Sequence, residues 1–398
     1  MKELLTRTEC TAMRGIAILA IILHNYCHYV KGIVKENEYQ FFDKRIDGLW
    51  EALTSPDEFL PMHLLSFFGH YGVPVFLFLS GYGLVRKYEK ESREQGHDYG
   101  ENRATSSPLD SFPFLRYHYL KLLRMFIVGF VLFIMVDAVT PGRVPFHWDN
   151  VIAQLLMYIN VLPEPDKIIW PGIYWFFGLM MQFYIVYRLL LYRRSSWLVV
   201  VLIAVCWLLQ VFCDPDGDTI NRLRYNFIGG MLPFGLGVIF GGTEVRGYGG
   251  TRLPWRVLSA AGVFSHPRTP VPPYLRIISR TPAPPHLRII SLLLALASIP
   301  LVLVMSFSFH SWLWIPVVII IGTIALVKAL PAVILKIFVF FGTYSAAMFV
   351  AHPIARKLFI TVAWQRDAYD GLMLYFVAAI GLSWAVKMII DCIPSPKM

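Results

Sequence analysis

The chain has 398 residues, of which 56% are hydrophobic and only 16% are charged, and its formal net charge is +10. Soluble domains carry about 25% charged residues, so the composition excludes an ordinary soluble protein and indicates an integral membrane protein. The basic residues lie in short connections between apolar segments and do not gather in one soluble domain, which argues against nucleic-acid binding.

Ten apolar segments are long enough to cross about 30 Å of hydrocarbon, and they predict an all-α, polytopic membrane helix bundle. They lie at 15–31, 64–85, 118–138, 173–192, 196–213, 225–242, 289–307, 311–330, 336–358 and 371–391. A cytoplasmic N-terminus places about 25 of the 36 Lys and Arg residues inside, as the positive-inside rule requires. With ten spans the C-terminus is cytoplasmic as well, and we interpret 1–398 as a single membrane domain.

The first span carries two ionisable side chains, Arg14 and His24. Arg14 is close enough to the inner interface for its long side chain to reach water. His24 lies about 15 Å further along the helix, and an ionisable group at that depth usually faces the bundle interior and marks a functional pathway. Because a histidine can accept and return a proton at neutral pH, His24 is the best candidate for the chemistry and would suit activation of a hydroxyl; the alternative is a structural hydrogen bond.

The second span contains Gly72, Pro74 and Gly81, followed closely by Tyr82. These residues break or thin the helix, which allows close helix approach or irregular backbone that lines a cavity.

A basic group stands at the cytoplasmic mouth of the third span: Arg116, Lys121 and Arg124. Lys121 and Arg124 are three residues apart and share a helix face, so the pair can hold phosphates by charge-assisted hydrogen bonds. Ordinary positive-inside anchoring is the alternative. The extra charges beyond Arg116 make a nucleotide-type ligand worth proposing.

The fourth span begins with aromatic residues that include Trp175, and it carries Gln182. Aromatic residues at the outer boundary usually form the interfacial belt, and stacking on a substrate is the functional alternative.

Residues 243–288 form a basic, Pro- and Arg-rich cytoplasmic linker. Residues 268–279 are repeated at 280–291 with two differences. Two copies are too few for a solenoid, and the prolines forbid a continuous helix. We interpret the segment as a duplicated linker, with docking of a partner or of anionic lipid as the alternative.

In the ninth span Ser345 and His352 are seven residues apart and lie on one face of the helix. A serine nucleophile is conceivable there, but a structural hydrogen bond is the simpler interpretation.

In this order, these segments resemble the acyltransferase 3 family of bacterial inner-membrane O-acyltransferases. The similarity covers most of residues 8–390, except the linker. The resemblance rests on the motifs occurring in the same order along ten spans. The resembling residues are Arg14-Gly-Ile-Ala-Ile-Leu with His24, Gly72 to Tyr82 with Ser80, Arg116 with Lys121 and Arg124, Tyr174-Trp175-Phe176 with Gln182, and Ser345 with Phe349 and His352.

The resemblance implies that acetyl-CoA or a related acyl-CoA binds from the cytoplasm, and that the acyl group passes to a glycan hydroxyl at or beyond the membrane. His24 would be the catalytic base with Arg14 as its partner, and Arg116, Lys121 and Arg124 would hold the donor. We assign the other matching polar and aromatic side chains to substrate binding: Ser80, Trp175, Gln182, Ser345 and His352.

One departure from the family pattern concerns the first span. The family commonly has ten residues between the arginine and the histidine, and this chain has nine. At about 100° per residue Arg14 and His24 lie about 80° apart around the helix, whereas His28 lies about 40° from Arg14, so either histidine can be the working base. Lys121, where the family more often has Arg, keeps the charge but loses bidentate geometry.

The sequence therefore predicts a multi-pass O-acetyltransferase of the bacterial inner membrane that modifies a surface or lipid-linked glycan, with no metal and no nucleic acid involved. The alternative is a glycan or lipid transporter (a flippase) without covalent chemistry. The acceptor sugar, the choice between acetyl and succinyl, a covalent or direct route, and the oligomeric state stay open.

Overall fold

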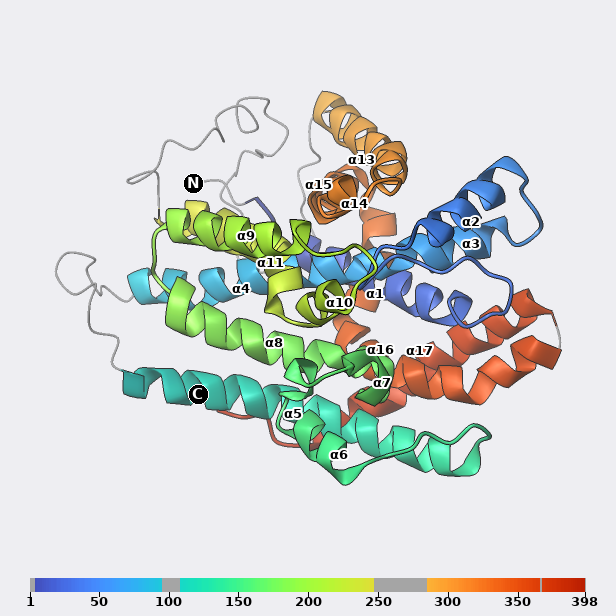
Figure 1. Cartoon of the computed structure of the whole chain (residues 1–398). Helices are drawn as coiled ribbons and strands as arrows, with labels where there is room; N and C mark the ends of the chain where they lie inside the picture. Colours follow the sequence, from blue (N-terminus) through green and yellow to red (C-terminus); the bar gives the residue numbers. More distant parts are fainter. Residues whose placement is uncertain (1–3, 95–107, 247–284, 366, 398) are drawn as a thin grey trace.

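A computed structural model describes residues 4–94, 108–246, 285–365 and 367–397 (Figure 1), and every regular element within them is helical. The first half contains α1 (Arg7–Cys27), α2 (Asp43–Thr54), α3 (Leu60–Phe68), η1 (Gly69–Tyr71), α4 (Gly72–Glu94), α5 (Pro108–Val139), α6 (Trp148–Leu155), η2 (Ile159–Val161), α7 (Pro165–Ile168), η3 (Gly172–Tyr174), α8 (Trp175–Val186) and η4 (Tyr187–Leu191). The second half contains α9 (Ser196–Val211), α10 (Asp218–Tyr225), α11 (Phe227–Arg246), α13 (Pro285–Met305), α14 (Phe309–Trp312), α15 (Ile315–Ala329), α16 (Ala332–Gln365) and α17 (Ala368–Cys392).

The all-α prediction is confirmed, and each of the ten predicted spans is helical over most of its length. In the described part of the chain seven helices are long and apolar enough to cross a membrane, or eight if the pair α10 and α11, bent by 43°, is one span. The two other segments, α9 and α15, have 16 and 15 residues. At 1.5 Å per residue they reach about 24 and 22 Å, short of a full hydrocarbon core, so the count of ten stays a prediction.

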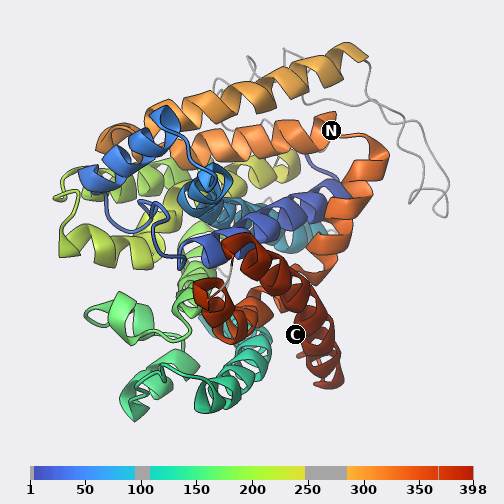
Figure 2. The ribbon, with the colours of Figure 1, turned by 90° about the vertical axis from the view of Figure 1, so that its right-hand side faces the viewer.

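Helix α1 lies in the middle of the bundle, packed against α16, α4, α3 and α15. A capping box begins it: the Thr6 side chain accepts a hydrogen bond from the Glu9 backbone, and the Glu9 carboxylate accepts one from the Thr6 backbone. In both views α13 and α15 lie on one side of the bundle, and α5 and α6 lie on the opposite side (Figures 1 and 2).

The crossing of α1 and α16 is closed by two glycines. A Cβ on Gly15 would lie 1.9 Å from the Phe338 carbonyl oxygen, and a Cβ on Gly342 would lie 1.8 Å from the Thr11 carbonyl oxygen. The two backbones therefore touch, which is the small-residue packing common between membrane helices.

Glycines also bring the second span against α1 at the depth of His24. A Cβ on Gly69 would lie 2.6 Å from the Cβ of His24, and one on Gly72 would lie 2.4 Å from the Ala17 carbonyl oxygen. The span changes from α-helix to a 3₁₀ turn at Gly69–Tyr71 before α4 begins. The predicted close approach is present at Gly72. The break lies just before the residues for which it was predicted, since α4 runs unbroken through Gly72, Pro74 and Gly81, and the 3₁₀ turn places the His70 ring centre 5.7 Å from that of His24.

The predicted linker 243–288 lies outside the described residues except at its ends. Residues 243–246 continue α11, and residues 285–288 begin α13.

Candidate functional site

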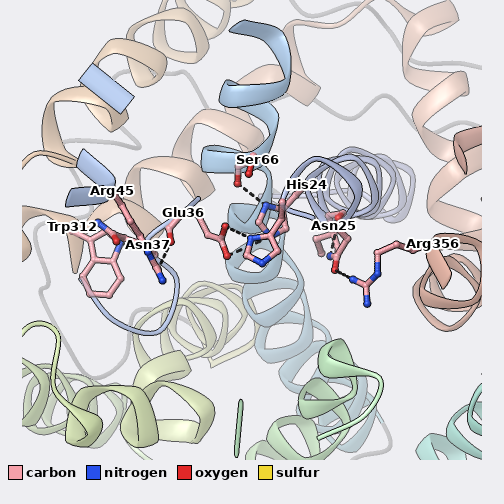
Figure 3. Close-up of polar contacts among 10 residues, drawn as sticks. His24, Asn25, Glu36, Asn37, Arg45, Ser66, Trp312 and Arg356 are labelled. Atoms are coloured by element: carbon pink, nitrogen blue, oxygen red, sulfur yellow. Dashed lines mark hydrogen bonds and ion pairs between the residues drawn. The ribbon is translucent and has the colours of Figure 1, made fainter. Parts of the chain in front are cut away.

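The segment after α1 turns back and brings a carboxylate over the end of that helix (Figure 3). Residues 28–42 contain no regular helix, and Glu36 lies within them. One Glu36 oxygen accepts from His28 Nδ1 at 2.6 Å, and the other lies 3.9 Å from His24 Nε2. His24 and His28 are one helical turn apart, so a single buried carboxylate faces both rings.

The other nitrogen of His24 fixes its tautomer. His24 Nδ1 lies 2.7 Å from the Ser66 carbonyl oxygen, which can only accept, so Nδ1 carries the hydrogen (Figure 3). Nε2 then holds a lone pair that points to the Glu36 side of the ring, which is the arrangement a general base needs.

Glu36 is held in place by its neighbours. Arg45 donates to its carbonyl oxygen, and the next carbonyl, of Asn37, accepts from the Trp312 indole at 2.9 Å (Figure 3). Burial alone would raise the pKa of the Glu36 carboxyl. The charge that His24 carries once it is protonated and the hydrogen bond from His28 outweigh burial and lower the pKa to about 2. Glu36 is therefore an anion at neutral pH.

Two residues away, Glu38 has the opposite character. Burial, followed by the charge of Glu36, raises the pKa of the Glu38 carboxyl to about 8, so this group is mostly protonated at neutral pH. Its backbone carbonyl accepts from Arg224 Nε at 2.6 Å. Two carboxyl groups with separated pKa values beside a histidine are typical of a catalytic site.

These groups line a cavity of about 270 Å³, here called the histidine cavity. Its wall comes from α1, the 28–42 segment, α2, η1, α4, α7, η3, α8, α10 and α16. The lining residues that matter for chemistry are His24, Asn25, His28, Tyr29, Glu36, Glu38, Tyr39, Gln40, Arg45, His70, Asp166, Trp175, Asn221 and Tyr225.

A buried arginine borders the cavity and was missed by the sequence analysis. Arg356 is 8% exposed and donates to Asn25 Oδ1 at 3.1 Å, and its guanidinium carbon lies 3.9 Å from the centre of the Tyr29 ring. An arginine within the ninth predicted span was a usable signal, because an intramembrane charge is a functional candidate by default. Glu36 gave no comparable signal, since its position depends on the path of the 28–42 segment.

The expected pairing of Arg14 with His24 is not formed. The two residues are ten positions apart on one continuous helix, about 15 Å along its axis. Arg14 is exposed and lies near Lys121 instead, together with Lys87 and Arg124. These four residues are called the basic cluster below.

The basic cluster combines cations with aromatic rings. Lys87 Nζ lies 4.9 Å from the ring centres of both Tyr88 and Tyr117. Arg124 is partly engaged, because it donates to the Ile393 carbonyl and to Ser395 Oγ at 3.0 and 2.7 Å. Arg116 does not join the cluster: it is exposed, about 140° around α5 from Lys121, and without a hydrogen bond or ion pair to any described residue.

Of the five residues assigned to substrate binding, Trp175 alone lines the histidine cavity. Ser80 and Ser345 donate to carbonyls of their own helices, of Phe76 and Gly342, which is the usual fate of a serine inside a helix. Gln182 donates to Asn226 Oδ1 at 2.7 Å and accepts from the Phe227 backbone at 2.9 Å, so it closes the break between α10 and α11.

The fifth residue, His352, is fully buried, with its Nδ1 3.0 Å from the Met348 carbonyl oxygen. It therefore satisfies one nitrogen within its own helix α16 and does not reach the wall of the cavity. The structural hydrogen bond expected as the simpler interpretation of this segment is present.

The ligand atoms of His24, His28 and Glu36 lie within 4.8 Å of one another, close enough to hold a divalent cation. Three protein ligands with a fourth position open are typical of catalytic zinc, and the bond from His24 Nδ1 to a carbonyl is a common support for a metal-binding histidine. The sequence predicts no metal, and removal of metal ions tests that prediction at these three residues.

Most of the chain matches one known protein family. Residues 10–388 match the sequence model of the acyltransferase 3 family, which is described as an acyltransferase domain. No curated protein and no solved structure matches the chain.

Proposed function

Because the chain belongs to the acyltransferase 3 family and is a multi-pass membrane protein, we propose that it is an O-acyltransferase with His24 as its general base. The donor is acyl-CoA, acetyl-CoA first among them, and the acceptor is a hydroxyl of a surface or lipid-linked glycan. The membrane is the inner membrane of a bacterium. The observation that carries the assignment is a buried imidazole whose Nδ1 is fixed on the Ser66 carbonyl while Nε2 faces Glu36 at the cavity.

The proposed reaction needs one proton shuttle. His24 Nε2 accepts the proton of the acceptor hydroxyl while that oxygen attacks the thioester carbonyl, and the C–S bond then breaks. The CoA thiolate leaves with the proton that His24 returns. Glu36, an anion 3.9 Å from Nε2, stabilises the imidazolium between these two transfers. General acid–base catalysis of this kind contributes about 10²–10⁴ in rate.

The basic cluster is the proposed entry for the donor. CoA carries phosphates, and Arg14, Lys121 and Arg124 offer charges that bind them. Since Arg14 and His24 are about 15 Å apart along α1, the extended pantetheine arm would bridge the two ends and bring the thioester to the histidine. Arg14 thus acts on the donor in this proposal and not on the imidazole.

The test uses the purified protein in lipid nanodiscs, acetyl-CoA labelled in the acetyl group, and a crude cell-envelope extract as acceptor. We expect free CoA and labelled glycan, and a loss of about 10²–10⁴ in kcat for His24→Gln. His310→Gln is the matched control, because His310 is an exposed histidine outside the cavity. A transporter would release no CoA, and unchanged turnover in His24→Gln would reject the assignment.

A further inference from the structure

One wall of the histidine cavity is aromatic and rigid. The rings of Tyr39 and Tyr225 are stacked, with centres 4.1 Å apart and planes 13° apart. Trp175 meets both edge-on, at 5.6 and 5.8 Å. The three rings come from the 28–42 segment, α8 and α10, so each is fixed by partners on other elements.

This wall is not part of the interfacial aromatic belt. Trp175 is 7% exposed and Tyr225 is 6% exposed, whereas a belt residue presents its ring to lipid headgroups. Rings that are buried yet line a cavity offer flat apolar surface to a bound molecule. The C–H face of a pyranose ring matches such a surface, because it is flat, weakly polar and gains dispersion contacts over its whole area.

Some polar groups of the same cavity can accept hydrogen bonds, and two of them are carboxylates. Asn221 is 8% exposed, donates to Gln40 Oε1 at 3.2 Å, and its own Oδ1 has no hydrogen-bond partner among the described residues. A ligand hydroxyl or amine would satisfy this buried acceptor. Two carboxylates, Glu36 and Asp166, line the cavity. The two arginines beside it already have partners: the Arg45 guanidinium is bonded to the Glu36 backbone carbonyl, and the Arg356 guanidinium is bonded to Asn25.

We propose that Tyr39, Trp175, Tyr225, Asn221 and Asp166 form an acceptor subsite that takes an uncharged or amine-bearing sugar ring and rejects acidic sugars. This inference rests on the proposed function and adds the class of the acceptor. Rejection follows because a carboxylate or sulfate on the sugar would lose its water beside the buried Glu36, where a like charge is costly. Asp166, on the exposed side of the cavity, adds a second like charge.

The experiment compares three probes as acceptors for His24-dependent acyl transfer: methyl glucoside, methyl glucosaminide and methyl glucuronide. We expect transfer to the first two, with kcat/KM for the glucuronide lower by about tenfold or more. The cell-envelope extract serves as the positive control for the proposed function. Suppose that the extract is labelled. Equal use of the three probes, preference for the glucuronide, or use of none of them would then overturn the acceptor subsite and leave the proposed function standing.

Two pairs of variants test the subsite itself. Asp166→Asn is expected to narrow the discrimination between glucoside and glucuronide by about threefold or more, whereas Asp214→Asn, an exposed acid outside the cavity, is expected to leave it unchanged. Tyr225→Leu is expected to raise KM for the sugar with little change in KM for acetyl-CoA. Tyr158→Leu, at a tyrosine that is 43% exposed and outside the cavity, is its control.

Asp166 is exposed, so its variant tests the inference even if Tyr225→Leu fails to fold. Unaltered discrimination in Asp166→Asn, or the same change in Asp214→Asn, would show that the acidic wall does not read the acceptor. Absence of labelling in both the extract and the probes would instead contradict the proposed acyltransferase chemistry.

Discussion

Replacement of Glu36 by Gln removes a charge and keeps a side chain that can still bond His28. At 3.9 Å and an effective dielectric constant of about 20, Glu36 stabilises a full positive charge on His24 by about 4 kcal/mol. If about half of the proton has moved in the transition state, the variant loses about 2 kcal/mol, which is about 30-fold in kcat.

The assay is the release of CoA from acetyl-CoA by protein in nanodiscs, with the envelope extract in excess. We expect kcat to fall while KM for acetyl-CoA stays within about twofold, because the loss concerns the transition state and not donor binding. Glu36→Asp, which keeps the charge on a shorter side chain, is expected to recover part of the rate. Wild-type kcat in Glu36→Gln, or an equal loss in Glu36→Asp and Glu36→Gln, would refute electrostatic support of His24 by this carboxylate.

Three other predictions concern the donor, the pH dependence of stability and the metal. Arg14→Gln and Lys121→Gln are each expected to raise KM for acetyl-CoA about tenfold, and Arg116→Gln is expected to leave it unchanged; equal effects at all three would contradict a defined basic cluster. The pKa of Glu38 lies near 8 in the folded protein and at the usual 4.5 when unfolded, so the folded state binds the extra proton and its stability falls as pH rises from about 4.5 to about 8. Glu38→Gln is therefore expected to raise Tm relative to the wild type by about 2 °C or more at pH 8, a gain that disappears near pH 4.5, as thermal scans in detergent at the two values would show. Treatment with EDTA and then with phenanthroline is expected to leave turnover unchanged; a loss restored by Zn²⁺ would establish a metal at the histidines.

The helical architecture was readable from the chain because apolar length is a strong signal in membrane proteins. The position of His24 at a cavity was also predictable, because an ionisable side chain within a membrane span usually faces the bundle interior. The glycines of the second span predicted a close approach that the Gly69 and Gly72 contacts with α1 confirm.

The partners of His24 could not be predicted, because they are set by tertiary folding. Glu36 reaches the ring through a segment without helical periodicity, and Ser66 contributes only a backbone carbonyl, which leaves no trace in the sequence. The pairing with Arg14 came from a family motif, although the two residues are ten positions apart on one continuous helix and therefore about 15 Å apart along its axis. Ser345 illustrates a further limit: hydroxyls inside helices bond their own backbone by default.

Gly69 packs directly against His24, so a mutation at Gly69 would disturb the histidine. A methyl group there would meet His24 Cβ and the Ala20 carbonyl oxygen, each at 2.6 Å. Even Gly69→Ala would therefore push the imidazole off its carbonyl anchor or force the second span outward. A genetic screen for inactive alleles should thus recover this chemically inert position alongside the histidine, and its alleles would mimic loss of the base although no reactive group was removed.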